Sequence, residues 1–150
     1  MMTDTFNELG LPAHLLRALE AQKITAPTPI QAQSIPPILA GHDLLGCAQT
    51  GTGKTAAFAL PTLQNLLGGA GTRVLALTPT RELAIQVAEQ FENLGKHLST
   101  RVALVYGGVD YEPQIKALLE GSDIVVATPG RLLDHMKRKT ADFSSLEVLI

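Results

Sequence analysis

Ala48-Gln49-Thr50-Gly51-Thr52-Gly53-Lys54-Thr55 is the stretch of this sequence that decides the fold. Its glycines allow the backbone to curl so that successive N–H groups point at one anion. Lys54 adds a mobile positive charge for the β- and γ-phosphates of a nucleotide, and the Thr55 hydroxyl can join the shell of a phosphate-bound Mg²⁺. The usual pattern begins with glycine, where this chain has Ala48, so the neighbouring sequence must decide.

The sequence on either side of this loop favours a phosphate site over a surface turn rich in glycine and threonine. Residues 44–47 before the loop predict a short buried strand, with Cys47 as a small buried side chain in it. Residues 56–60 after the loop predict a helix that packs on a sheet. Strand, glycine-rich loop and helix is the order that phosphate binding needs, because the helix N-terminus adds its positive dipole end.

Composition places the chain among single-domain globular proteins. Its 150 residues suffice for one domain with a sizeable core, and its single cysteine excludes an internal disulfide and indicates a reducing compartment. The N-terminus lacks the regions of a secretory signal, and no apolar run approaches a membrane span, so we expect a cytoplasmic protein. With a net charge of −2, any nucleic acid must be held by local contacts rather than by overall attraction.

From residue 43 onward, short apolar runs alternate with helical patterns. Runs typical of strands buried on both faces cover residues 43–47, 74–78, 102–105, 124–127 and 148–150. Such repeats predict an α/β fold, with a parallel sheet flanked by helices on both faces. Residues 1–42 are interpreted as a helical cap that belongs to the same domain as the core at residues 43–150. The histidines lack metal-ligand spacing and are expected at the surface or its boundary: His14, His42, His97 and His135.

Several motifs flank the phosphate-binding loop, and their joint order is more specific than any one of them. They are Phe6 and Pro27-Thr28-Pro29-Ile30-Gln31 before the loop, then Pro79-Thr80-Arg81-Glu82-Leu83-Ala84, Gly107-Gly108 and Thr128-Pro129-Gly130-Arg131. Over essentially the whole chain, this order resembles the first RecA-like domain of a DEAD-box RNA helicase. The resemblance implies a RecA-like P-loop NTPase fold, ATP and Mg²⁺ as cofactors, and RNA as a sequence-independent partner. Ala48 fits the DEAD-box form of the loop, and the short N-terminal extension resembles bacterial members such as the RhlE-like subgroup.

The segment before the loop is predicted to read adenine. A glutamine carboxamide has a donor edge and an acceptor edge that match N6 and N7 of adenine, whereas guanine has an acceptor in place of the amino group. Gln31 resembles the glutamine of the family's Q motif, which implies nucleotide contacts by Lys23, Thr25 and Thr28 as well. Lys23 stands where the family usually has glycine. Phe6, 17 residues before Lys23, is spaced like the family's aromatic residue that stacks on adenine. Gln31 as a surface residue and Phe6 as an apolar staple of the first helix are the alternatives.

Three segments that follow apolar runs are predicted to hold RNA. Open parallel sheets bind ligands beyond the carboxyl ends of their strands, where glycine backbones and helix N-termini offer N–H donors. The resemblance implies that these segments grip the sugar-phosphate backbone of single-stranded RNA, which carries no base information. Each segment taken singly is also ordinary turn or helix-start chemistry. The predicted RNA-binding residues are Pro79, Thr80, Arg81, Gly107, Gly108, Thr128, Pro129, Gly130 and Arg131.

Lys54 and Thr55 are the predicted catalytic residues, with Thr55 also binding metal through Mg–ATP. A P-loop NTPase further needs carboxylates that hold Mg²⁺ and position water. The family supplies them as Asp-Glu-Ala-Asp after a strand like residues 148–150, and no acidic residue here has an equivalent place. We therefore expect a core that is incomplete at its C-terminal end and no ATP turnover by these 150 residues alone. The resemblance also implies a second RecA-like domain, and ribosome-assembly or RNA-degradation proteins as possible partners.

Three functions remain open from the sequence. The first is an ATP-dependent RNA helicase that locally unwinds RNA duplexes, of which this chain is the N-terminal portion. The second is a nucleotide-binding module without catalytic turnover. The third is another P-loop ATPase, such as a DNA helicase, against which Gln31 and the run at residues 79–84 argue.

Overall fold

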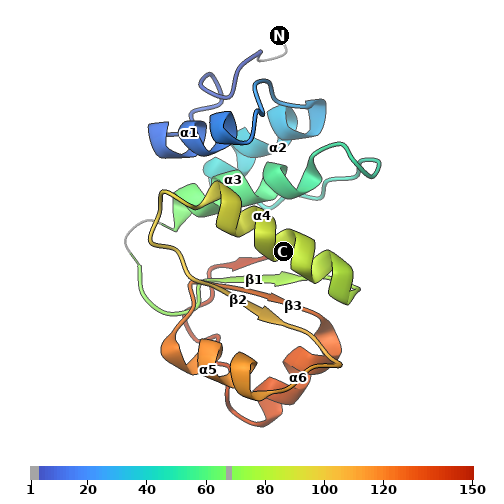
Figure 1. Cartoon of the computed structure of the whole chain (residues 1–150). Helices are drawn as coiled ribbons and strands as arrows, with labels where there is room; N and C mark the ends of the chain where they lie inside the picture. The colour runs from blue at the N-terminus through green and yellow to red at the C-terminus, as the bar shows by residue number, and fades with distance from the viewer. Residues whose placement is uncertain (1–3, 67–68) are drawn as a thin grey trace. The chain divides into compact units, whose positions relative to one another are not determined.

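The chain divides into two compact units in a computed structural model that describes residues 4–66 and 69–150. The helical unit comprises Met1–Leu67 and Asn93–Ser99, and the sheet unit comprises Gly68–Glu92 and Thr100–Ile150. Figure 1 labels the helices and strands of both. The predicted boundary between a cap at residues 1–42 and a core at residues 43–150 differs from the boundaries of these two units, and that division stays a prediction.

The helices that lie wholly within the described part of the helical unit are α1 (Ala13–Ala21), α2 (Pro29–Leu39) and α3 (Lys54–Asn65). α2 has Thr28 at the N-cap and Pro29 at the first helical position, where a missing N–H does no harm. The unit has a closely buried apolar core, with side chains 4% exposed or less, that includes Phe6, Leu15, Leu19, Ile35, Leu60 and Leu63.

α1 ends in a turn that explains how Lys23 replaces a glycine. The Lys23 N–H donates to Glu20 O at 2.9 Å and the Ile24 N–H donates to Leu19 O at 3.0 Å, which together make a Schellman motif. This motif requires a left-handed residue after the C-cap, and Lys23 adopts φ = +60° there. The turn therefore forms with lysine, at the steric cost of a Cβ in the left-handed region.

Replacing Lys23 with glycine is expected to stabilise the protein. Relief of the left-handed strain contributes about 1–2 kcal/mol, and the added freedom of the unfolded chain offsets roughly half of it. Urea unfolding followed by circular dichroism should show a net gain of about 0.5–1 kcal/mol. The matched control is Lys23→Ala, which keeps the Cβ and should give no gain. A Lys23→Gly variant no more stable than Lys23→Ala would contradict the strain argument.

The sheet unit contains four parallel strands in the order β2-β3-β1-β4. They are β1 (Val74–Leu77), β2 (Val102–Val105), β3 (Ile124–Ala127) and β4 (Val148–Leu149). The connecting helices are α4 (Arg81–Leu94), α5 (Glu112–Glu120) and α6 (Pro129–Lys137). Figure 1 shows α4 over one face of the sheet and α5 and α6 over the other. The predicted parallel sheet with helices on both faces is confirmed.

The register of the sheet brings the strand ends to one edge. Leu77 of β1 and Val105 of β2 both pair with Ala127 of β3, so these three strands finish side by side. All four residues of β3 are buried, as expected for a strand covered on both faces. Under α5 and α6 the core consists of Leu75, Ala103, Val105, Val125, Ala127 and Leu132.

The prediction of a buried strand before the phosphate-binding loop is wrong. Residues 42–49 have no regular secondary structure, the Leu45 side chain is 99% exposed, and Cys47 is exposed as well. A strand is stable only with neighbours that share its hydrogen bonds, and the described part of the helical unit, to which this segment belongs, contains no strand. The apolar sequence alone gives no information about which partner is available.

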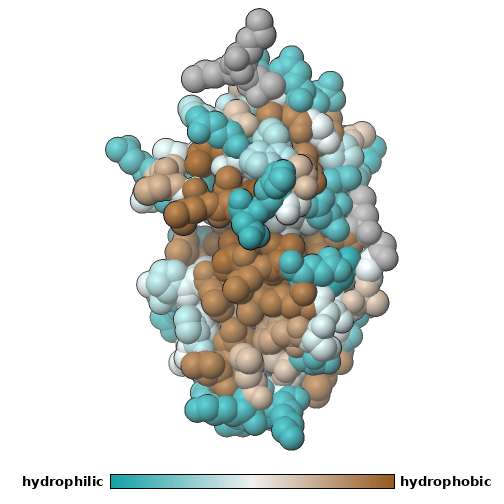
Figure 2. All heavy atoms as spheres, turned by 180° about the vertical axis from the view of Figure 1, so that it is seen from behind, coloured by the Kyte–Doolittle hydropathy of each residue, from teal (hydrophilic) through white to brown (hydrophobic). Residues whose placement is uncertain are grey.

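Large apolar side chains remain at the surface on both units. Figure 2 colours the surface by hydropathy and shows exposed apolar side chains. Among the large exposed side chains are Leu45 and, on the short strand β4, Leu149, which is 65% exposed. In the part of the chain that the structure describes, no helix is both long and apolar enough to cross a membrane.

Candidate functional site

The phosphate-binding loop leads directly into α3, as its sequence predicts. Gly51 and Gly53 both have left-handed backbones, with φ of +81° and +85°, and α3 begins at Lys54. The Thr52 hydroxyl donates to Gln49 O at 2.6 Å, which closes the turn. The Lys54 ammonium donates to Ala48 O at 2.7 Å and so lies across the loop. The start of α3 thus presents a lysine and the positive end of a helix dipole beside one curled backbone.

Gln31 is buried and links α2 to the phosphate-binding loop. Its Oε1 accepts from the Thr28 N–H at 3.0 Å, and its Nε2 donates to Gly53 O at 3.1 Å. Gln31 is only 4% exposed, so the alternative of a surface residue is excluded. A carboxamide has two acceptor lone pairs and two N–H donors, so one of each remains for a ligand after these contacts.

Gly53 is required by this packing as well as by its backbone angle. A Cβ at residue 53 would collide with Nε2 of Gln31 and would lie 3.2 Å from the Thr28 hydroxyl. The Thr28 hydroxyl approaches the Gln31 backbone in the manner of a capping box, but among the described residues no hydrogen bond satisfies it. A buried hydroxyl without a partner, next to a loop of N–H donors, fits a site that takes a polar ligand.

Three other residues predicted to touch the nucleotide have different surroundings. Phe6 is 4% exposed and belongs to the core of the helical unit, which favours the alternative that Phe6 is an apolar packing residue. Lys23 and Thr25 are exposed, and Lys23 shapes the turn after α1. Their contacts with adenine stay predictions, and so does the stacking of Phe6.

The three segments predicted to hold RNA meet at the carboxyl ends of the strands. The Thr78 N–H donates to Ala127 O at 2.9 Å, which ties the end of β1 to β3. The Thr128 N–H donates to Val105 O at 2.9 Å, which ties the end of β3 to β2. The sequence motifs at residues 79–84, 107–108 and 128–131 therefore leave the sheet from one edge, as expected for an open parallel sheet.

Arg81 and Gly108, from different segments, lie next to each other. A Cβ at Gly108 would be 3.6 Å from Nη1 of Arg81, and Gly108 has φ = +85°. Thr80 caps α4, since its hydroxyl accepts from the Leu83 N–H at 3.2 Å. Pro79 and Arg81 are exposed, and Arg81 contacts Glu82 at 3.6 Å. An exposed pair of this kind stabilises little, so the guanidinium is available to a stronger anion.

Glycines leave open backbone at the same edge. A Cβ at Gly107 or Gly130 would meet nothing within 4 Å. α6 begins at Pro129, and its N-cap residue Thr128 makes no side-chain cap hydrogen bond. The first turn of α6 therefore keeps N–H groups that a phosphate can accept from.

Arg131 reaches back from α6 to the segment that follows β2. Its Nη1 donates to Val109 O at 2.9 Å and to Gln114 Oε1 at 3.3 Å, and its guanidinium lies 3.8 Å from the centre of the Tyr111 ring. None of these partners carries a negative charge, so the positive charge of Arg131 is not neutralised by them. Gln114 and Tyr111 belong to no motif in the sequence, and no pattern pointed to them.

His135 contradicts the prediction that every histidine is a surface or boundary residue. It is fully buried, with Nε2 2.9 Å from Gln114 Oε1 and Nδ1 2.8 Å from the Thr140 hydroxyl. Burial lowers the pKa of His135 below its ordinary value, and the charges of Arg131 and Arg138 lower it further. The imidazole is therefore neutral at pH 7. Its position at the C-terminal turn of an amphipathic helix was the signal that the side chain could face the core.

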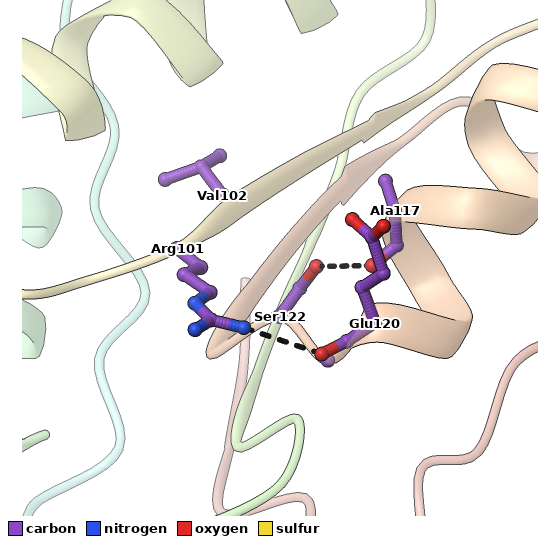
Figure 3. Close-up of a pocket in the computed structure, with 6 residues that line it drawn as sticks. Arg101, Val102, Ala117, Glu120 and Ser122 are labelled. Atoms are coloured by element: carbon purple, nitrogen blue, oxygen red, sulfur yellow. Dashed lines mark hydrogen bonds between the residues drawn. The ribbon is translucent and has the colours of Figure 1, made fainter.

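A cavity of about 520 Å³ lies away from these segments, beside the start of β2. Figure 3 shows its lining, where Arg101 donates to Glu120 O at 3.2 Å and Ser122 donates to Ala117 O at 3.0 Å. Ligands of parallel sheets bind beyond the carboxyl ends of the strands, and this cavity lies at the amino ends. Two of its polar side chains, Arg101 and Ser122, are already hydrogen-bonded to backbone carbonyls, so this cavity is not the candidate site.

The phosphate-binding loop with Gln31, and the segments at one edge of a parallel sheet, are features of a P-loop α/β protein, and comparison with known proteins gives the family. The family model described as "DEAD/DEAH box helicase" matches residues 28–150, so the chain belongs to that family. The chain is 53% identical over 148 residues to the ATP-dependent RNA helicase DeaD of Escherichia coli (strain K12), and 51% identical to the DeaD of Klebsiella pneumoniae. These alignments cover 97% of the chain but 24% and 23% of the relatives, so the chain spans about a quarter of their length.

Solved structures agree with the family. A DEAD box protein from the hyperthermophile Methanococcus jannaschii superposes with a TM-score of 0.93 and 41% identity, over 99% of this chain and 41% of that one. A hypothetical ATP-dependent RNA helicase from Sulfolobus tokodaii superposes with a TM-score of 0.84 and 40% identity, over 91% of this chain and 39% of that one. The predicted RecA-like fold and DEAD-box membership are confirmed. The relatives named here are called DeaD, and the RhlE-like subgroup stays a prediction.

Proposed function

We propose that this chain is the ATP- and RNA-binding portion of an ATP-dependent RNA helicase that locally unwinds RNA duplexes. ATP binds as its Mg²⁺ complex at residues 48–55 and Gln31, and single-stranded RNA lies across the carboxyl ends of β1, β2 and β3. A second RecA-like domain completes the catalytic site, and the protein acts in the cytoplasm.

The contact between Gln31 and Gly53 carries this proposal. A residue whose free donor and acceptor suit adenine is hydrogen-bonded to the loop whose N–H groups suit phosphates. One ligand that has an adenine at one end and phosphates at the other satisfies both. With Mg–ATP bound, Lys54 would neutralise phosphate charge and the Thr55 hydroxyl would join the Mg²⁺ shell.

The arrangement at the sheet edge supports RNA as the second ligand. Arg81, Arg131 and the start of α6 offer charged and neutral donors along one edge, and Gly107 and Gly130 keep the backbone open to a chain of phosphates. Contacts of this kind read no base, which suits a helicase that acts on RNA of any sequence. It also explains how a chain with a net charge of −2 holds a polyanion.

Gln31→Ala is expected to weaken ATP binding roughly tenfold or more and to change GTP binding much less, because one bidentate base contact is worth about 1–3 kcal/mol of discrimination. The measurement is the dissociation constant of each nucleotide by isothermal titration. Gln33→Ala, which changes an exposed glutamine of the same helix, is the control and should leave both constants unchanged.

The ratio of the two nucleotide affinities decides this test. Gln31 also supports the loop through Gly53, so its loss can lower the affinity for any nucleotide. Equal losses for ATP and GTP would mean that Gln31 only supports the loop, and the reading of adenine would have to be abandoned.

A stand-alone nucleotide-binding module is the weaker candidate. The family match extends through the sheet to residue 150, and the relatives are named as helicases rather than as binding proteins. The predicted RNA segments also converge at one edge, which nucleotide binding alone does not require.

A further inference from the structure

The guanidinium of Arg131 is fixed by neutral groups on three sides. Nη1 is used twice, by Val109 O and by Gln114 Oε1, and the face of the group lies on the Tyr111 ring. A guanidinium has five N–H donors, so those of Nε and Nη2 remain in the plane of the group. A phosphate bound there would meet two parallel donors, the geometry that arginine offers to oxyanions.

Gln114 can act as a support because its own orientation is fixed. Its Nε2 donates to Tyr106 O at 2.9 Å, which turns Oε1 toward both Arg131 and His135. The His135 Nε2 must then carry a proton and donate it, while Nδ1 accepts from the Thr140 hydroxyl at 2.8 Å. Gln114 and His135 are 6% and 0% exposed. Rotation of the amide would therefore leave several buried polar groups unpaired, at about 1–3 kcal/mol each.

Tyr111 is held in the same way on the other side. Its hydroxyl donates to Asp134 Oδ2 at 2.9 Å, so the ring cannot turn away from Arg131. The guanidinium of Arg138 lies over the same ring at 4.0 Å. Among the described residues, neither Arg131 nor Arg138 forms an ion pair with a carboxylate. Two guanidinium groups therefore lie on one ring, and the carboxylate beside that ring, Asp134, is hydrogen-bonded to the Tyr111 hydroxyl and forms no ion pair with either of them.

We propose that Gln114 and Tyr111 are positioning residues that hold Arg131 ready for an RNA phosphate. This inference rests on the proposed function of the sheet edge as an RNA interface. It adds residues outside the motifs that carry the family resemblance, and it assigns the buried His135 and Thr140 to the support of Gln114. A guanidinium fixed before binding loses little side-chain entropy when the phosphate arrives.

The test compares Gln114→Met and Tyr111→Leu with Arg131→Ala by RNA affinity at several salt concentrations. A single-stranded RNA oligonucleotide is titrated and followed by fluorescence anisotropy. We expect each positioning variant to weaken binding about three- to tenfold and to reduce the slope of log K against log salt by up to about 0.7, the loss of one phosphate contact to a single strand. Tyr111→Phe keeps the ring but loses the hydrogen bond to Asp134 that holds it, so its loss of affinity should be smaller than that of Tyr111→Leu.

Double variants separate positioning from general damage. With Arg131 already replaced by alanine, Gln114→Met or Tyr111→Leu should cause little further loss, because the group they position is gone. Lys116→Gln on α5 removes an exposed charge that pairs with Glu120 at 3.8 Å, and it should leave the salt slope unchanged. Tyr111 is only partly buried, so its variant remains informative if replacement of the buried Gln114 reduces folding.

The outcomes of the positioning test and of the proposed function can be told apart. If Arg131→Ala leaves RNA binding and its salt slope unchanged, then Arg131 is not an RNA contact, and the proposed interface itself is wrong at that residue. If Arg131→Ala weakens binding but Gln114→Met and Tyr111→Leu do not, or if their losses add fully to that of Arg131→Ala, the interface stands and the positioning role is overturned.

Discussion

Gly53→Ala is expected to lower the affinity for ATP roughly 100-fold. The left-handed backbone at residue 53 costs a non-glycine residue about 1–2 kcal/mol. The new Cβ also collides with Gln31, which cannot move aside because Thr28 holds its other end. Crowding of this kind costs typically 1–3 kcal/mol more. The free variant relieves this cost when the loop leaves its native shape, and ATP binding must restore that shape, so each 1.4 kcal/mol lowers the affinity tenfold. Titration calorimetry with Mg–ATP measures the loss.

Two other glycines serve as matched controls for Gly53→Ala. Gly51 and Gly41 have nearly the same φ, +81° and +84°, but a Cβ at either meets nothing within 4 Å. Gly41→Ala tests the backbone penalty outside the loop, and Gly51→Ala tests it inside. The double variant Gly53→Ala with Gln31→Ala should lose less than the sum of its parts, since the collision is removed. If Gly51→Ala were as harmful as Gly53→Ala, the Gln31 contact would not be the cause.

Lys54→Ala is expected to weaken the binding of ATP and ADP by about 2–3 kcal/mol, which is 30- to 150-fold. Charge-assisted hydrogen bonds to phosphate are of this strength, and no other side chain of the loop carries a positive charge. Lys54 is exposed and bonds only to a loop carbonyl, so its removal should change the free energy of unfolding by less than about 0.5 kcal/mol.

Adenosine provides the control ligand for Lys54→Ala. It contains the base and the sugar but no phosphate, so its affinity should be the same for both proteins. Lys54→Arg keeps the charge on a different shape and should retain part of the ATP affinity. A loss of adenosine affinity as large as the loss of ATP affinity would show that the substitution damages the site as a whole.

The phosphate-binding loop and the sheet could be predicted because their signals are local. Glycine spacing before Lys54 determines the loop, and uninterrupted runs of Val, Ile and Leu mark strands buried on both faces. The sequence also predicts that Arg81, Gly108 and Arg131 lie at one edge of the sheet, because the carboxyl ends of parallel strands share an edge.

The errors came from features that depend on distant partners. Residues 43–47 have the composition of a strand, but composition does not say whether a neighbouring strand is present to share hydrogen bonds. Buried polar contacts were missed for the same reason. Gln114 and His135 belong to different helices, and their hydrogen bond joins residues 21 positions apart. Nothing in the local pattern of either helix indicates that its partner is polar.

The amide of Gln31 has a thermodynamic consequence. It joins the first turn of α2 to the start of α3, 22 positions further along the chain, so neither end of this link can loosen without breaking the other. A ligand that binds only the closed arrangement stabilises it by RT ln(1 + [L]/Kd). Backbone amides at the start of α2 lie far along the sequence from the phosphate-binding loop, but they should exchange their hydrogens more slowly as nucleotide is added. Hydrogen exchange at this helix end would then report whether the loop is occupied.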